Sequence, residues 1–258
     1  PKQIRANIPY VLKKTGKTYD IPEWLLNSPV TIYRAEDQGP ATKYLSTLQD
    51  FKGTKQRILI CDDDVVFDQD TVKEYEKAIQ NFPESAVAAF GAEFKRKVNT
   101  DNNSLDDIYF QETECDIYAG KIHPIMAMFF PHKKLESISE KINSKSIDMV
   151  YGAFTYCIAA DMVNPDELAL FDTMPKEAYF VDDVVMSANL SANNISKKVI
   201  HHLPVPRITY SSFLSSVFSY LFHTTHESEA LSQTVNVEHK NDNVMIRHFK
   251  HVWGTKPF

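Results

Sequence analysis

The apolar residues of the chain occur in short runs divided by polar stretches, a pattern typical of alternating strands and helices. Ile58–Ile60 is a continuous apolar run, as expected for a strand buried on both faces of a sheet. A helix is predicted from about residue 71 to 82, with Asp70 as its N-cap. Its apolar residues share one face: Val72, Tyr75, Ala78 and Ile79. Ala86–Phe94 predicts a second strand, so this stretch reads as a βαβ unit with a right-handed crossover.

The remaining pattern extends this alternation over the whole chain. Strands are predicted at residues 4–8, 30–33 and 199–206, and further apolar structure at 122–130 and 149–160. Helices are predicted at residues 41–48, 184–193 and 211–222. We therefore expect an α/β fold with a mixed, mostly parallel central sheet flanked by helices, in one domain of residues 1–258.

Composition narrows the functional classes. The chain has 258 residues, a net charge of −6 and 43% hydrophobic residues, which is ordinary for a globular protein and argues against disorder. The acidic balance argues against a general nucleic-acid binder, so no nucleic-acid partner is expected. No apolar run is long enough for a transmembrane segment. The basic string Lys95–Lys97 is predicted to be a solvated strand end.

The cysteines carry little chemistry. Cys61, Cys115 and Cys157 form no CxxC pair, so neither a zinc site nor a disulfide framework is predicted. Cys61 and Cys157 lie in apolar runs, where a reduced thiol is expected to behave as a small buried hydrophobe. Reduced cysteines without a recognisable signal peptide favour the cytoplasm, and a start at Pro1 rather than Met leaves secretory targeting open.

Three carboxylates follow the best-defined strand. Asp62, Asp63 and Asp64 come directly after it, and ligands of open α/β sheets bind beyond the carboxyl ends of the strands. Their mutual repulsion is relieved by a cation, and Mg²⁺ or Mn²⁺ is often held by one or two carboxylates together with substrate phosphates. In an extended segment Asp62 and Asp64 point to the same side. A metal site and a solvated acidic turn are both consistent with this string.

Two other polar strings have a structural and a functional interpretation. Asp182 and Asp183 open a predicted helix, where one acid can cap and the other can act as a general base. In the string EDQGPATK of residues 36–43, Gly39 and Pro40 indicate a turn before a helix. Lys43 would lie near the N-terminus of that helix, a region that favours anions, although an ordinary loop explains the string equally well.

Together these strings resemble a GT-A-fold glycosyltransferase of the broad family-2-like type. The matching strings run in order from about residue 4 to residue 205: IPYVLKKTGKTYDIPEWL, EDQGPATKY, ILICDDDVVF, VYGAFTYCI and FVDDVVMSANL. The resemblance implies a Rossmann-like fold with a nucleotide-sugar-binding half at about 1–115 and an acceptor-binding half at about 116–258. It also implies a UDP-sugar donor, a glycan or glycoconjugate acceptor, and a Mn²⁺ or Mg²⁺ cofactor.

The resemblance also assigns residues on the donor side. Asp62 and Asp64 match the DxD-type acids that bridge the metal to the diphosphate, with Asp64 the better ligand. Asp63 belongs to the same donor-binding string, and Asp37 and Lys43 would line the donor side.

On the acceptor side the resemblance concerns three residues. Gly152 matches a small-residue turn near the donor sugar and the acceptor. Asp183 matches the base of inverting members, with Asp182 in reserve. Together these imply an inverting transfer to an acceptor hydroxyl.

The chain departs from the family pattern in two ways. Relatives usually begin with an additional strand and helix upstream of the match. The chain also has no QxxRW-like string, so transfer is expected to be non-processive.

Two other functions are consistent with the same residues or the same fold. A nucleotidyltransferase could use the same carboxylates, although no GxxxxGK[ST] loop is present. A non-catalytic sugar- or partner-binding domain could share the fold.

Overall fold

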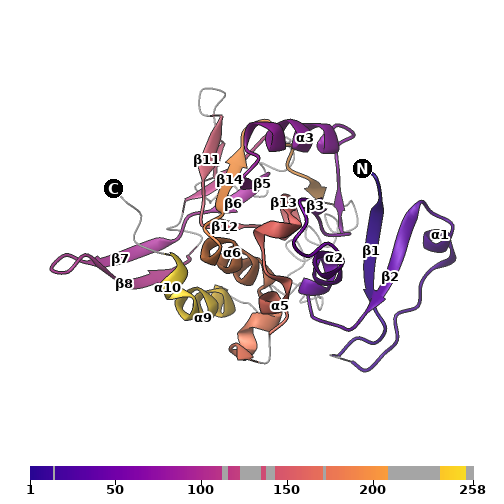
Figure 1. Cartoon of the computed structure of the whole chain (residues 1–258), viewed down its shortest axis with the longest axis horizontal. Coiled ribbons are helices and arrows are strands. Elements are labelled where there is room, and N and C mark those ends of the chain that lie inside the picture. The colour runs from indigo at the N-terminus through magenta and orange to yellow at the C-terminus, as the bar shows by residue number, and fades with distance from the viewer. Residues whose placement is uncertain are drawn as a thin grey trace, which may run out of the picture.

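The computed structural model describes residues 1–13, 15–111, 116–122, 135–137, 143–170, 173–208 and 239–253 (Figure 1). Its centre is a five-stranded sheet of mixed direction, in the order β11-β14-β5-β13-β3. These strands are β3 (Arg57–Ile60), β5 (Ser85–Ala88), β11 (Ser144–Ser146), β13 (Tyr156–Ala159) and β14 (Ser196–Ile200). The α/β class is therefore confirmed.

The strand directions correct the expectation of a mostly parallel sheet. β3, β5 and β14 run the same way, but β13 is inserted antiparallel between β3 and β5, and β11 is antiparallel to β14. Within this sheet only β5 and β14 are paired in parallel, as far as the described residues show. The two strands of the predicted βαβ unit are thus separated by β13. Because β13 follows β3 by nearly 100 residues in the chain, the local pattern of apolar residues could not predict its position between the two strands.

Both faces of the sheet are covered, as the apolar run in β3 predicted. Along β5, Ala86 and Ala88 pack into a core with α6 (Asp182–Ala192), whereas Val87 faces the core formed with α3 (Thr71–Asn81). Figure 1 shows α3 on one side of the sheet and α6 on the other. Alternation of side chains along a strand sends successive residues to the two cores.

Smaller sheets surround the central one. The predicted strand over Ala86–Phe94 divides after Ala88, and its second part, β6 (Phe90–Ala92), joins a separate four-stranded sheet in the order β10-β9-β6-β12. The other members are β9 (Ile117–Ala119), β10 (Leu135–Ser137) and β12 (Met149–Val150). Three two-stranded sheets complete the described strands: β1 (Ile4–Pro9) with β2 (Val30–Ala35), β7 (Lys95–Asn99) with β8 (Ser104–Tyr109), and β4 (Val65–Val66) with β15 (Arg207–Ile208).

Helices form where the apolar spacing predicted them. Residues 41–48 become η1 (Ala41–Lys43) and α2 (Leu45–Asp50), with Tyr44, Leu45 and Leu48 buried as expected. The other described helical segments are α1 (Glu23–Leu26), η2 (Gly152–Phe154), η3 (Ala160–Met162), α5 (Pro165–Leu168), η5 (Lys176–Phe180), α9 (Lys240–His248) and α10 (Lys250–Trp253). None of the helices in the described ranges is long and apolar enough to cross a membrane. The helix predicted at 211–222 and most of the segment 122–130 lie outside the described residues.

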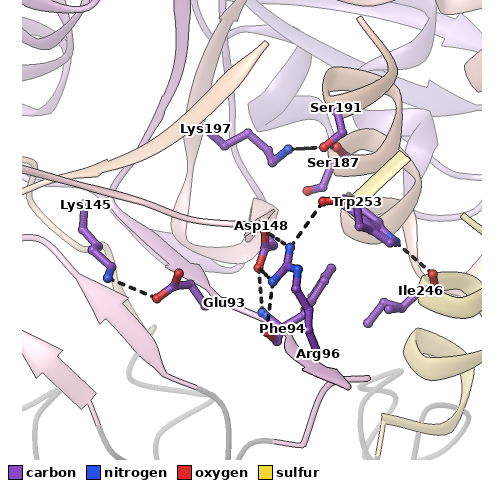
Figure 2. A network of polar contacts seen from close by, with 10 residues as sticks. All are labelled: Glu93, Phe94, Arg96, Lys145, Asp148, Ser187, Ser191, Lys197, Ile246 and Trp253. Carbon is purple, nitrogen blue, oxygen red and sulfur yellow. Dashed lines mark hydrogen bonds and ion pairs between the residues drawn. The ribbon is translucent and has the colours of Figure 1, made fainter. Parts of the chain in front are cut away.

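Two predictions about single side chains are wrong. Cys61 is exposed, because the chain leaves the sheet directly after Ile60, whereas Cys157 is buried as expected and Cys115 lies outside the described residues. Arg96 is not part of a solvated strand end: its guanidinium lies inside the molecule against Asp148 (Figure 2). The local sequence predicted that this string is solvated, whereas Arg96 is buried by its ion pair with Asp148, which lies 52 residues further along the chain.

Candidate functional site

Lys43 stands at the centre of a group of acids drawn from distant parts of the chain. Its Nζ lies 2.8 Å from Asp62 Oδ1, in the loop after β3, and 3.3 Å from Asp182 Oδ2, at the start of α6. Asp183 and Gly152 complete the group, which we call the Lys43 cluster: Lys43, Asp62, Gly152, Asp182 and Asp183. The structure therefore brings together five of the residues that the sequence singled out.

The backbone around Lys43 is held by buried neighbours. Asn7 on β1 donates its side-chain amide to the Lys43 carbonyl at 2.8 Å. Tyr44 is buried beside it, and its hydroxyl lies 3.5 Å from the carbonyl oxygen of Asp182. Lys43 ends η1 two residues before α2 begins, so it lies near a helix N-terminus as the sequence predicted, and its ammonium is directed to Asp62 and Asp182.

Gly152 allows the cluster to close. Its backbone N–H donates to Asp183 Oδ1 at 2.9 Å. A Cβ at this position would lie 2.6 Å from Lys43 Nζ and 2.9 Å from Asp183 Oδ1, closer than atoms normally approach. Only glycine lets the backbone, the ammonium and the carboxylate meet here without displacement.

The charges of the cluster do not balance, because three carboxylates share one ammonium. Burial lowers the pKa of Lys43, but Asp182, Asp183 and Asp62 outweigh it and raise that pKa well above its ordinary value. Burial, and next the neighbouring Asp182, raise the pKa of Asp183 well above that of a free carboxyl. Asp182 is also raised in pKa, chiefly by burial, and its Oδ2 is buried without a well-formed hydrogen bond. The cluster therefore contains a fixed cation beside a carboxyl with increased proton affinity.

Neither acid at the start of α6 caps that helix. Val181 occupies the N-cap position of α6 and its side chain makes no capping hydrogen bond, and Asp183 Oδ1 accepts from the Gly152 N–H instead. The predicted cap of α3 is likewise absent, since Asp70 precedes the helix without a capping hydrogen bond. Asp182 and Asp183 therefore do not cap α6, although both lie in its first turn, where acids are favourable to the helix dipole.

A buried tyrosine that sequence reasoning missed lies beneath the cluster. Tyr156 is fully buried, and its hydroxyl has no hydrogen-bond partner among the residues that the structure describes. Burial, and then the charges of Asp183 and Asp182, raise its pKa well above the ordinary value. The apolar string that contains it predicts a core strand, so nothing local distinguishes this hydroxyl from an ordinary core tyrosine.

The acidic triplet departs from an extended strand. Asp62 is half-buried, while Asp63 and Asp64 are exposed and the chain bends at both, so the predicted alternation of side chains does not apply. Burial, and next the charges of Asp62 and Asp63, raise the pKa of Asp64. Among the described residues, no three His, Cys, Asp or Glu side chains form a ready metal site. The triplet fits a hard divalent ion only if oxygen atoms of the substrate supply the remaining ligands.

Asp37 lies in a hydrogen-bonded turn apart from the Lys43 cluster. Its carboxylate accepts the backbone N–H of Lys13 and that of Gly39, each at 2.8 Å. Tyr179 lies alongside, and burial followed by the charge of Asp37 raises the pKa of Tyr179 to about 12. Asp37 thus anchors two loops, and no described contact joins it to the Lys43 cluster.

Comparison with known proteins does not identify a family for the chain. No protein-family model matches the chain, and no curated protein matches it.

Proposed function

We propose that the protein is a metal-dependent, non-processive glycosyltransferase of the GT-A type. It moves a sugar from a nucleoside-diphosphate donor, a UDP-sugar in our proposal, to an acceptor hydroxyl with inversion. The observation that carries the proposal is the Lys43 cluster, in which an ammonium contacts Asp62 beyond β3 and Asp182 beside Asp183. A phosphate-binding cation and a carboxyl of raised pKa are the two groups that such a transfer requires.

Asp183 is the general base in this proposal. Its bond to Gly152 uses one carboxylate oxygen and orients the other. The acceptor hydroxyl gives its proton to Asp183 and attacks the anomeric carbon, while the bond from that carbon to the diphosphate breaks with its electron pair. A raised pKa suits this task, because a base works best when its pKa lies near the working pH. Asp182 remains the alternative.

Lys43 stabilises the leaving diphosphate. Negative charge grows on the diphosphate as the bond breaks, and a cation fixed in advance lowers that barrier. The ion pairs with Asp62 and Asp182 keep Lys43 in place and protonated before the donor arrives. Gly152 lets Lys43 and Asp183 approach its backbone closely, and in our proposal the donor sugar and the acceptor meet near this turn.

The acidic triplet would hold the metal. Asp62 and Asp64 supply two carboxylate ligands for Mn²⁺ or Mg²⁺, and the diphosphate would supply further oxygens. When bound, the ion neutralises charge on the diphosphate. The surplus of acids around Asp64 supports this assignment, since a cation relieves their repulsion. Asp63 belongs to the same donor-binding loop.

The test is nucleoside diphosphate release from a panel of nucleotide sugars, with and without Mn²⁺. We expect release that depends on Mn²⁺ and is abolished by Asp64→Ala. Asp68→Ala is the matched control, because Asp68 is an exposed acid four residues further on whose ion-pair partner, Arg207, lies at 3.7 Å. Release that persists in Asp64→Ala would contradict the metal assignment. Nucleotide-sugar binding without release would instead indicate a non-catalytic sugar-binding domain.

A further inference from the structure

Thr155 holds a backbone conformation that threonine rarely adopts. Its φ is +66° and its ψ is 141°, in a region that is populated almost entirely by glycine. The residue is fully buried and lies between η2 and β13, three positions after Gly152. A β-branched residue keeps such a conformation only where its surroundings enforce it.

Four hydrogen bonds provide that enforcement. The Thr155 hydroxyl donates to the carbonyl of Ile60 at 2.7 Å, and its backbone N–H donates to the carbonyl of Gly152 at 3.1 Å. Its own carbonyl accepts from the Tyr75 hydroxyl at 2.8 Å and from the Ala89 N–H at 3.3 Å. Thr155 therefore joins β3, α3, the β5–β6 junction and the η2 turn.

Two of these bonds lead to the Lys43 cluster along separate segments of the chain. Ile60 is the last residue of β3, and Asp62 follows it by two positions. Gly152 is the residue whose N–H holds Asp183 and whose missing side chain admits Lys43. Through its hydroxyl and its N–H, Thr155 thus fixes the position of the η2 turn, which contains Gly152, relative to the loop that contains Asp62.

We infer that Thr155 is a positioning residue whose hydroxyl bond to Ile60 holds the Gly152 turn at the distance from Lys43 and Asp183 that the reaction needs. It touches none of the reacting groups and acts through Gly152. The catalytic consequence rests on the proposed glycosyl transfer, whereas the effect on the turn does not.

The test compares Thr155→Val, which keeps the shape and removes the hydroxyl, with Thr155→Ser, which keeps the hydroxyl. Thr71→Val is the matched control, because Thr71 is a buried threonine whose hydroxyl has no partner. Hydrogen exchange of the Gly152 amide reports the turn. The Val150 amide, bonded to the Ser187 hydroxyl at 3.1 Å, serves as the internal reference.

We expect Thr155→Val to speed exchange at Gly152 about tenfold relative to Val150, since one buried hydrogen bond is lost. We also expect it to lower kcat about tenfold with little change in the donor KM, as for a misplaced catalytic group. Thr155→Ser should restore both values, and Thr71→Val should change neither. If Thr155→Val does not fold, Thr155→Gly removes the same hydroxyl and accepts the backbone conformation without strain.

Unchanged Gly152 exchange in a folded hydroxyl-free variant would overturn the inference, whatever happens to activity. Equal acceleration at Gly152 and Val150 would also overturn it, because Thr155 would then only stabilise the fold. Faster exchange at Gly152 in a protein whose wild type releases no nucleoside diphosphate would support the positioning role and refute the proposed function.

Discussion

Two of the buried charged groups in the described part of the chain are built on opposite principles. Around Asp148, each carboxylate oxygen accepts from one guanidinium nitrogen of Arg96, at 2.7 and 2.8 Å, and the Phe94 N–H adds a third bond (Figure 2). Around Lys43, a single ammonium serves three carboxylates, and Asp182 Oδ2 is left without a well-formed hydrogen bond. The first group is balanced and the second is not.

The difference separates a balanced ion pair from a cluster that is a candidate for chemistry. The Arg96–Asp148 pair joins β7 to the segment before β12, and Arg96 also reaches the carbonyl of Trp253 at 3.5 Å. A buried pair of this kind holds elements in one arrangement and has no surplus charge to offer a ligand. The Lys43 cluster keeps surplus acid and shifted pKa values, the features that mark candidate active sites.

The largest expected effect comes from the unbalanced cluster. Asp183→Asn keeps the acceptor oxygen that faces Gly152 and removes the base, so we expect kcat to fall by roughly 10² to 10⁴. Stability should not fall, because one of three repelling acids becomes neutral. Asp70→Asn is the matched control, being an acid at another helix start that makes no capping bond. Equal activity losses in the two variants, measured as initial rates, would contradict the assignment.

The balanced pair should show the opposite profile. Arg96→Ala removes the guanidinium that pairs with the buried Asp148 carboxylate, and we expect the free energy of unfolding to fall by about 3–5 kcal/mol. Turnover per folded molecule should be unchanged. Lys97→Ala, an exposed change on the same strand, should stay within about 0.5 kcal/mol of wild type. Denaturant titration checks both, and similar losses in the two variants would show that the pair has no special role.

Two glycines extend the comparison to smaller effects. Gly152→Ala places a Cβ against the flexible end of Lys43, so we expect kcat/KM to fall about 10- to 100-fold with little loss of stability. Gly91→Ala places its Cβ 2.2 Å from Ile147 Cδ1 and 2.7 Å from the Met149 carbonyl, inside the second sheet. That change should instead lower the free energy of unfolding by about 1–3 kcal/mol. The comparison fails if Gly152→Ala unfolds the protein as readily as Gly91→Ala.

The smallest effect concerns pH. Because burial and Asp182 raise the pKa of Asp183 in the folded state, this carboxyl holds its proton more fully in the native protein than in the unfolded chain above about pH 3.8, the ordinary value. Stability from this group is therefore lost as pH rises from there toward the raised pKa, by at most about 1.4 kcal/mol per pH unit. Asp183→Asn removes the loss, so its stability advantage should grow with pH. An advantage independent of pH between 4 and 7 (roughly the window of carboxyl titration) would contradict the raised pKa.

The helical periods and the apolar runs were readable in the sequence because they are local. The two-faced burial of β3, the buried face of α2 and the start of α6 after Val181 follow from side chains within a few residues of one another. The same local information placed Asp62, Asp182 and Asp183 at the ends of elements, which is why they were selected as site residues.

The sequence by itself therefore determined the α/β class, the elements with clear apolar periodicity, and the candidate acids and lysine that meet around Lys43. Tertiary structure decided the rest, because strand pairing and buried ion pairs join residues that are far apart in the chain. It inserted β13 between β3 and β5, used the Asp37 carboxylate for two backbone amides, and buried Arg96 against Asp148. It also forced Thr155 into a left-handed conformation and left Tyr156 without a partner, since contacts from several elements act on them at once.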